Sequence, residues 1–534
     1  MTVISEKNLT FASIRKRARK MLYPIGIQDF EKIRKDGFVY VDKTDLIFKM
    51  AQKGGYYFLS RPRRFGKSLL VSTMEAYFSG KKELFDGLAI ADLENDWIQY
   101  PVLRFDLTGK SYTATDDLQD HLDKQLSILE NKYGIKKEYD SADVRFQCVI
   151  EAAYEKTGRR VVILIDEYDK PIVDNLGNDE LADVFRGQLQ GFYSVMKAKD
   201  GFIQFGFLTG VTKIGKLSVF SGLNNLKDIS MDARYTDICG ISEKDLKKYF
   251  GESVKELAEA NDLTIKETYN QLAEMYDGYH FRQSSVGIYN PFSVLNTFDS
   301  GEFKEYWFET GTPSFLVKMM KETSYDVTRL SGDEVGSTLL TDVDSAFANP
   351  VPFLYQAGYL TIKDYDKEYK LYKVGFPNKE VKDGFLNYLL NFYAPVQSES
   401  TNALISRMSR DIRSGNAEGF MQKLETLFAK TSYQIQGDSE KDFQYAMYII
   451  LELMGEYVEV EKATSNGRID VLLQTKDYIY IIEIKINDTV EAALQQIEEK
   501  AYARRFADDR RKLFKIGVRF STENRCIDDW KLVE

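Results

Sequence analysis

The sequence is poor in the residues that build disulfide frameworks, histidine-based sites and long linkers. Its 3 cysteines lie far apart, so neither a disulfide framework nor a cysteine zinc site is indicated. Its 2 histidines, His121 and His280, argue against histidine-rich metal sites. With 10 prolines and no Ser/Gly-rich tract, there is little room for long disordered linkers. Any catalysis is therefore expected to rest on carboxylates, lysine and metal ions.

Long hydrophobic runs are also missing. No apolar stretch approaches the roughly 20 residues that span a bilayer, and residues 1–20 lack the apolar core of a signal peptide. We therefore expect a cytoplasmic protein with no membrane partner. The formal net charge of −10 argues against non-specific coating of nucleic acid. Basic clusters at 15–20 and 504–512 are interpreted as solvated surfaces, and the net charge does not exclude a local basic groove.

The 534 residues exceed what one hydrophobic core usually supports, so several domains are expected. After a basic tail at 1–20, residues 21–240 alternate apolar runs with helical spacing, as in a parallel sheet with helices on both faces. Residues 241–395 are rich in aromatics and mostly helical in pattern, with small-sheet elements. Residues 396–534 predict a compact α/β/α unit.

The expected elements follow from periodicity and turn residues. In the first region, strands are predicted at 56–59, 100–107, 160–165 and 202–208, and helices at 66–78, 118–132 and 181–196. In the last region, helices are predicted at 441–455 and 490–506, and strands at 468–474, 478–486 and 515–520.

A phosphate-binding loop is indicated at Arg61–Ser68, directly after a predicted strand. Lys67 would reach the β- and γ-phosphates and Ser68 would supply a hydroxyl for Mg²⁺, although Arg61 replaces the usual first glycine. A second Gly-Lys-Ser at 109–111 shows that the tripeptide alone means little. Only the first copy is followed at once by an apolar helix, whose N-terminus favours phosphate, whereas acidic residues follow the second. We therefore predict ATP contacts from Arg63, Arg64, Phe65, Gly66, Lys67, Ser68, Leu69, Asp166 and Thr209.

Asp166 and Glu167 end an apolar run that predicts a buried strand. Ligands of such sheets bind at the carboxyl ends of the strands. Asp166, with Ser68, is predicted to hold Mg²⁺, and Glu167 to orient or deprotonate the attacking water.

Further candidates follow the next strand. Thr209, Thr212 and Lys213 are candidates for sensing the γ-phosphate, and Arg234 is a candidate arginine finger. Helix capping or solvation explains each of them equally well.

A second set of catalytic candidates lies near the C-terminus. Asp470 lies on one predicted strand, and Glu483 and Lys485 share a face of the next because of their spacing of two. Two carboxylates that hold Mg²⁺ beside a lysine suit metal-dependent phosphodiester hydrolysis. A cross-strand surface salt bridge is the alternative. An open, hydrated cleft would favour catalysis, whereas a buried, closed Lys485 ion pair would favour a non-cleaving role.

Several motifs together carry a family resemblance that covers nearly the whole chain. They are Tyr23–Phe30, Tyr40–Thr44, Arg61–Ser68, Leu164–Asp169, Gly222–Leu226, Tyr276–Tyr279, Tyr289–Ser293 and Gly375–Asn378. On these motifs the chain resembles the bacterial AAA-ATPase-like proteins that carry a C-terminal PD-(D/E)XK nuclease-superfamily domain. In that family the Arg61 position commonly departs from glycine.

The resemblance implies a restriction-endonuclease-like C-terminal domain whose core maps to Asp470, then Glu483 and Lys485. Ile469 stands where the superfamily name has proline, which is a frequent departure. Gln496 and Tyr502 match positions that support the site, and an upstream acid is expected at Glu440 or Asp442.

The leading hypothesis is an ATP-hydrolysing protein coupled to an Mg²⁺-dependent nuclease that acts on DNA or RNA. The alternative is a nucleotide-driven switch or scaffold whose C-terminal domain binds nucleic acid or protein without cleaving. A homo-oligomer is compatible with both hypotheses.

Overall fold

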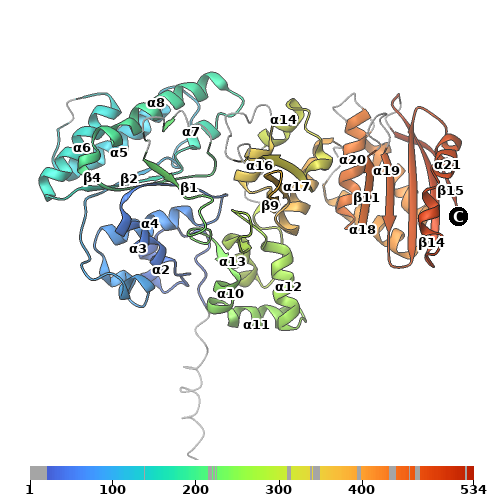
Figure 1. Ribbon diagram of the computed structural model, residues 1–534, viewed down its shortest axis with the longest axis horizontal. Helices are drawn as coiled ribbons and strands as arrows, with labels where there is room; N and C mark the ends of the chain where they lie inside the picture. Colours follow the sequence, from blue (N-terminus) through green and yellow to red (C-terminus); the bar gives the residue numbers. More distant parts are fainter. Residues whose placement is uncertain are drawn as a thin grey trace, which may run out of the picture. The chain divides into compact units, whose positions relative to one another are not determined.

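The computed structural model describes residues 21–136, 139–213, 219–220, 223, 225–308, 314–336, 340, 349–393, 398–431, 440–455, 457–462, 469–523 and 526–534 (Figure 1). The chain divides into two compact units. The first contains residues 1–310, 318–325 and 331–380, and the second contains residues 311–317, 326–330 and 381–534. In the described part of the chain, each helix falls short of the length or apolarity that spanning a bilayer requires.

A five-stranded parallel sheet in the order β2-β3-β4-β1-β5 forms the centre of the first unit. Its strands are β1 Gly55–Ser60, β2 Val102–Asp106, β3 Val161–Asp166, β4 Ile203–Gly210 and β5 Leu226–Asp228. β3 is buried along its whole length, as expected for a strand covered on both faces. Since β4 lies between β1 and β3, the chain segments that leave these three parallel strands meet at the carboxyl end of the sheet.

Helices cover both faces of this sheet, as predicted (Figure 1). One layer contains α5 Asp117–Tyr133, α6 Ala142–Thr157 and α8 Asp179–Ala198, and the other contains α2 Phe30–Asp36, α3 Thr44–Lys53 and α4 Lys67–Phe78. Short helices complete the layers: η1 Lys82–Phe85, η2 Ala89–Asp92, α7 Lys170–Val173 and η3 Asp200–Phe202. The helix α6 was not predicted from the sequence.

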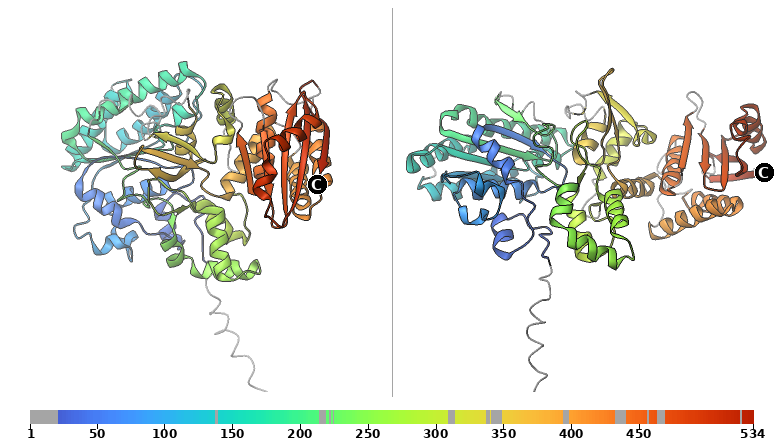
Figure 2. Two further views of the ribbon diagram at one scale, coloured as in Figure 1. Left: turned by 45° about the vertical axis from the view of Figure 1, so that its right-hand side comes forward. Right: turned by 60° about the horizontal axis from the view of Figure 1, so that its bottom comes forward.

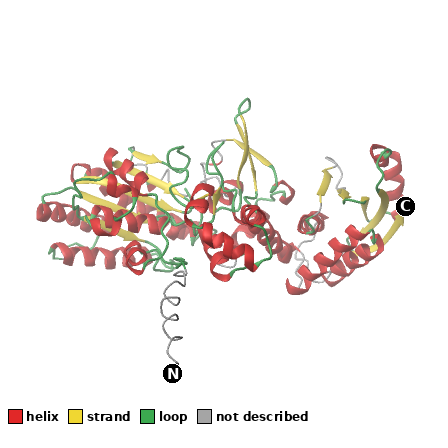
Figure 3. Ribbon diagram, turned by 90° about the horizontal axis from the view of Figure 1, so that it is seen from below, coloured by secondary structure: helices red, strands yellow, loops and turns green. Residues whose placement is uncertain are grey.

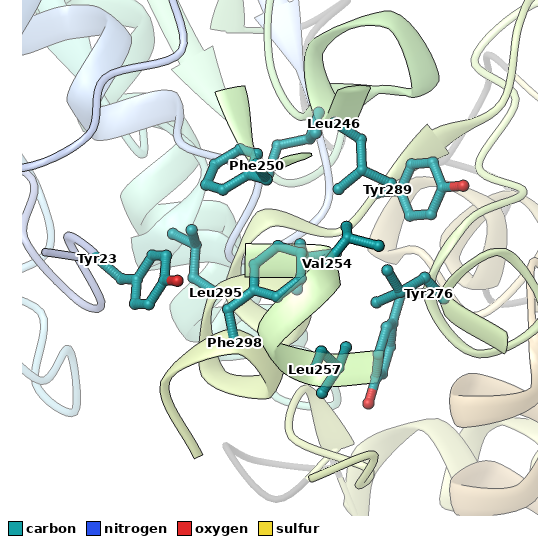
Figure 4. Packing of buried hydrophobic residues seen from close by; sticks show 12 residues of the cluster. Tyr23, Leu246, Phe250, Val254, Leu257, Tyr276, Tyr289, Leu295 and Phe298 are labelled. Atoms are coloured by element: carbon teal, nitrogen blue, oxygen red, sulfur yellow. The ribbon is translucent and has the colours of Figure 1, made fainter. Parts of the chain in front are cut away.

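A helical cluster follows the sheet along the chain and packs on its own apolar core (Figure 4). It consists of α10 Glu243–Tyr249, α11 Gly251–Ala260, α12 Ile265–Tyr276 and α13 Pro291–Ser300, with the strand pair β6 Ile241–Ser242 and β7 Ile288–Tyr289. Tyr23, from the start of the described chain, stacks there against Phe250 and Phe298, so the N-terminal segment is part of this core.

The rest of the middle region combines short helices with a small antiparallel sheet in the order β8-β10-β9. The elements are α14 Ser314–Glu322, η5 Val327–Arg329, β8 Asp333–Gly336, α16 Val351–Ala357, β9 Thr361–Asp366 and β10 Leu371–Gly375. The predicted helical middle region with small-sheet elements is therefore present.

A five-stranded mixed sheet in the order β11-β12-β13-β14-β15 dominates the second unit. Only β13 and β14 pair in parallel, because α21 and η6 connect them across one face of the sheet. The strands of this sheet and the helices beside it lie near the C-terminus marked in Figures 2 and 3. The strands are β11 Tyr457–Lys462, β12 Ile469–Gln474, β13 Tyr478–Ile486, β14 Lys512–Ser521 and β15 Cys526–Val533. The helices are α17 Lys379–Tyr393, α18 Ser398–Ser414, α19 Ala417–Thr431, α20 Glu440–Leu453, α21 Val490–Glu499 and η6 Tyr502–Phe506.

The helix predicted at 490–506 is wrong in its second half. α21 ends at Glu499, and Ala501 adopts the left-handed conformation with φ 50°. An α-helix of L-residues cannot continue through that conformation, so the chain turns there and resumes as the 3₁₀ helix η6.

Candidate functional site

The segment between β1 and α4 has the geometry of a phosphate-binding loop. β1 ends at Ser60 and α4 begins at Lys67, so the N-terminus of a 12-residue helix opens onto the loop. Gly66 precedes that helix with φ 89°, which is in the left-handed region that favours glycine. The helix dipole and the unpaired N–H groups of its first turn therefore point toward any anion bound at the loop.

A cavity of about 470 Å³ lies at this loop. Its lining contains the predicted base, Glu167, and six of the nine predicted ATP contacts: Arg63, Arg64, Gly66, Lys67, Ser68 and Leu69. The other three predicted contacts, Phe65, Asp166 and Thr209, are not part of the lining. The other walls of the cavity come from Pro24–Gln28 before the sheet and from Pro291, Phe292 and Leu295 of α13. The two outer segments were noted in the sequence only as family motifs, since nothing in their spacing shows that they meet the loop.

Lys67 is the first residue of α4 and is 4% exposed. Its Nζ donates to the carbonyl oxygens of Arg61 and Pro62, at 3.0 and 3.2 Å. It also forms an ion pair with Glu167 Oε1 at 3.1 Å. The predicted phosphate ligand and the predicted base therefore neutralise each other, and a phosphate oxygen that binds Lys67 would compete directly with Glu167.

Asp166 is fully buried at the end of β3. Its Oδ1 accepts a hydrogen bond from the Thr209 hydroxyl at 2.7 Å, while Oδ2 has no hydrogen-bond partner of normal geometry within the described residues. Burial raises the pKa of this carboxyl, and the hydroxyls of Thr209 and Ser68 oppose the rise. A buried oxygen with an open coordination position beside a serine hydroxyl fits Mg²⁺, which prefers oxygen ligands.

Asp169 was missed by the sequence analysis. It is buried at the cavity and accepts hydrogen bonds from the Val211 and Thr212 N–H groups and from the Thr212 hydroxyl. Burial, with a contribution from the nearby Glu167, raises the pKa of Asp169 to about 6. The residue therefore fixes the segment that follows β4, a contact that the predicted strand ranges alone did not indicate.

The Arg61 side chain, which stands where the usual first glycine of the loop would be, is not part of the cavity lining. It is 1% exposed, and its guanidinium donates to the carbonyl oxygens of Ser60, Ser230, Tyr235 and Thr236. Its Cζ lies 4.0 Å from the centre of the Phe281 ring, a cation–π contact. Arg61 therefore anchors the loop from behind.

The further candidates predicted after the next strand, and the second Gly-Lys-Ser, lie in different places. Thr209 faces Asp166, and Thr212 is held by Asp169, but Lys213 forms an ion pair with Asp228 on β5, at 2.9 Å. Arg234 is exposed and paired with Asp232, beside a separate hollow formed with α3. The second Gly-Lys-Ser is not part of the cavity lining, and its lysine, Lys110, pairs with Asp117 at 2.9 Å.

The second unit brings Glu483 and Lys485 to the face of its sheet that α21 covers. They are 1% and 5% exposed, and Lys485 Nζ lies 3.3 Å from Glu483 Oε1. Lys485 also donates to the side-chain oxygen of Gln496 on α21. This buried, closed arrangement is the one expected for a non-cleaving role. Glu483 Oε2, however, is buried without a hydrogen-bond partner among the described residues, which fits an oxygen ligand for a cation.

The partner acids of Glu483 are described only through the backbone. β12 and β13 are antiparallel, and their register pairs Asp470 directly with Glu483. The side chains of Asp470, Glu440 and Asp442 lie outside the described residues. Tyr502, the other predicted supporting residue, packs against the apolar cluster between α21 and the sheet.

The comparisons with known proteins define the class. Residues 24–220 match the model of the predicted AAA-ATPase family, and residues 438–530 match a PD-(D/E)XK nuclease-superfamily model. The chain is also 36% identical over 525 residues to the "Uncharacterized protein in vnfD 5'region" of Azotobacter chroococcum mcd 1, covering 96% of this chain and 98% of that protein. The chain belongs to the family of AAA-ATPase-like proteins with a C-terminal PD-(D/E)XK nuclease-superfamily domain.

Proposed function

We propose that the first unit binds and hydrolyses ATP. The observation that carries this proposal is the convergence of Lys67, Ser68 and Glu167 on one cavity at the N-terminus of α4, with the buried Asp166 carboxyl beside the Ser68 hydroxyl. In this proposal the phosphates lie at the helix N-terminus and Lys67 binds their terminal oxygens. A magnesium ion held by Ser68 and Asp166 supplies charge stabilisation at the phosphates.

Glu167 then acts on the attacking water. While Lys67 holds Glu167 in the ion pair, the carboxylate cannot accept a proton from water effectively. When the γ-phosphate takes over Lys67, Glu167 becomes available to orient and deprotonate that water. The apolar wall of Pro291, Phe292 and Leu295 is suited to pack against the base of the nucleotide.

For the second unit we propose Mg²⁺-dependent cleavage of nucleic acid, DNA or RNA. The support is the open coordination position at Glu483 Oε2, with Asp470 opposite it in the strand register. These carboxylates would hold Mg²⁺, which would supply Lewis-acid activation of a water and charge neutralisation at the phosphodiester. Lys485, positioned by Gln496, would orient that water.

A second candidate function for this unit is nucleotide-controlled binding without cleavage. It is favoured by the closed Lys485–Glu483 ion pair, which leaves the lysine with little exposed surface. For either function we propose the cytoplasm, since the 3 cysteines lie far apart along the chain, as is compatible with a reducing compartment.

One assay separates these functions. The purified protein is incubated with labelled DNA and RNA, with and without ATP, in Mg²⁺, Mn²⁺ or EDTA, and both phosphate release and strand cleavage are measured. We expect Glu483→Ala to lose cleavage and keep ATP turnover, and Lys67→Ala to lose ATP turnover. Glu491→Ala and Lys49→Ala, which change exposed residues of the same two units, are the controls.

The outcomes lead to different conclusions. Cleavage by Glu483→Ala at the unmodified rate contradicts the nuclease site. ATP turnover without metal-dependent cleavage of any strand supports the binding function. Normal ATP binding by Lys67→Ala contradicts the phosphate loop itself.

A further inference from the structure

The phosphate loop is packed against residues that come much later in the chain. The Phe65 ring contacts the Tyr279 and Phe281 rings, with centroids 4.8 and 5.5 Å apart. Pro62 packs so closely on Gly358 that a Cβ atom at Gly358 would lie 2.6 Å from Pro62 Cβ. The middle region therefore shapes the loop from the side that faces away from the cavity.

Trp307 makes the most specific of these contacts. It is 6% exposed, and its indole N–H donates to the carbonyl oxygen of Arg63, inside the loop, at 3.1 Å. Its backbone N–H donates to Glu380 Oε1 at 2.7 Å. Because both ends of this residue are hydrogen-bonded, a displacement of Arg63 must either move Trp307 or break a buried hydrogen bond.

Glu380 joins three parts of the first unit. It is fully buried in the first turn of α17, and its two carboxylate oxygens lie 3.0 and 2.7 Å from the Ser293 hydroxyl. Ser293 belongs to α13, and its neighbour Phe292 lines the cavity. One carboxylate therefore connects the phosphate loop, the apolar wall of the cavity and the first turn of α17.

We propose that Trp307 and Glu380 are positioning residues that couple the geometry of the phosphate loop to that of α13 and α17. The inference rests on the proposed binding of ATP at the loop. Nucleotide that sets the loop geometry thereby also sets the position of Glu380, in the first turn of α17, and the coupling acts equally in the reverse direction because linkage is reciprocal. Neither residue touches the nucleotide in this proposal.

The first experiment leaves the contacts intact. The chain has 3 tryptophans, Trp97, Trp307 and Trp530, so the Trp97→Phe/Trp530→Phe variant reports on Trp307 alone. ATP with Mg²⁺ is titrated while emission and heat are measured on the same sample. We expect the Trp307 emission to change in step with the calorimetric binding curve. An unchanged emission at nucleotide saturation overturns the coupling.

The second experiment removes the contacts. Trp307→Phe and Glu380→Ala are each expected to raise the Kd for ATP about tenfold and to lower kcat, because the loop loses its support. Glu380→Gln, which keeps an acceptor for both donors, is expected to restore most of this loss. Trp97→Phe is the matched control, since Trp97 packs against Tyr77 and Phe85 away from the cavity.

The failures can be told apart. If the unmodified protein gives no calorimetric signal with ATP, the proposed ATP function fails, and this inference fails with it. If the unmodified protein binds ATP but Trp307→Phe matches Trp97→Phe in Kd and kcat, only the positioning role is overturned.

Discussion

At the scale of single residues, the ion pair between Lys67 and Glu167 controls whether Glu167 is available as the proposed base. Both side chains are largely buried, so their attraction is stronger than that of a surface pair. ATP has to displace one partner, whereas Asp166 keeps an open oxygen throughout. The binding of ATP and the activation of the attacking water are therefore expected to depend on different residues, so substitutions can separate the two effects.

Glu167→Gln tests that separation. We expect this variant to bind ATP at least as tightly as the unmodified protein, because Lys67 no longer has an anionic competitor, while turnover falls about 100-fold or more for want of a general base. Equilibrium binding and single-turnover hydrolysis measure the two effects. Glu180→Gln, at the exposed start of α8, is the control. Unchanged turnover in Glu167→Gln would exclude Glu167 as the base.

Asp169 predicts a pH dependence of stability. Its pKa is about 6 in the folded protein against 3.8 ordinarily, so the folded state holds this proton more tightly than the unfolded state. Its contribution to the free energy of unfolding is therefore present below about pH 4 and is lost as the pH rises through about 6, by about 3 kcal/mol. Asp169→Asn removes this titration.

Denaturant unfolding of both proteins between pH 4 and pH 7 measures the effect. The stability of the unmodified protein should fall relative to that of Asp169→Asn as the pH rises through that window. A difference between the two that stays constant with pH would show that Asp169 does not titrate there.

At the scale of elements, regular apolar patterns predicted the strands and helices that position the loop, because burial on both faces leaves continuous apolar runs in the sequence. β1, β3, β4 and α4 lie close to their expected ranges. The end of α21 was not predictable, since it depends on the backbone conformation of Ala501 rather than on periodicity. The edge strands β11 and β15 were also missed, because their sequences lack continuous apolar runs.

The same distinction holds for the candidate site. The Lys67–Ser68 and Asp166–Glu167 pairs are visible in the sequence because each follows an apolar strand. The buried role of Arg61 and the contacts of Asp169 were not visible, because their partners lie far away along the chain. Local sequence therefore indicated the chemistry of the site, but not the contacts that support it.

Gly66, which precedes α4, gives a test with a matched glycine. An alanine Cβ meets no atom within 4 Å at Gly66 or at Gly158, the glycine that ends α6, and both have positive φ angles. Each Gly→Ala change should cost about 1 kcal/mol of stability through backbone strain. Only Gly66→Ala should also weaken ATP binding, because relaxing that strain reorients the loop N–H groups. Equal ATP affinities in the two variants would contradict this role of Gly66.

At the scale of the whole molecule, the two compact units should respond differently to nucleotide. We expect two calorimetric unfolding transitions. ATP with Mg²⁺ should raise the free energy of unfolding of the first unit alone, by about 2.7 kcal/mol at an ATP concentration of 100 times Kd. Lys67→Ala should abolish the shift, while Lys49→Ala should keep it. A shift that persists in Lys67→Ala would place the nucleotide elsewhere.

The packing of the phosphate loop against residues 279–358 also has a consequence for how the protein is made. The ribosome completes the loop, the sheet and Asp166 long before it adds Phe281, Trp307 and Gly358. Until those residues emerge, Phe65 has no aromatic partners and Arg61 lacks the ring that covers it. A nascent chain therefore cannot assemble the finished loop, so the proposed hydrolysis of ATP is expected to begin only once most of the chain has been synthesised.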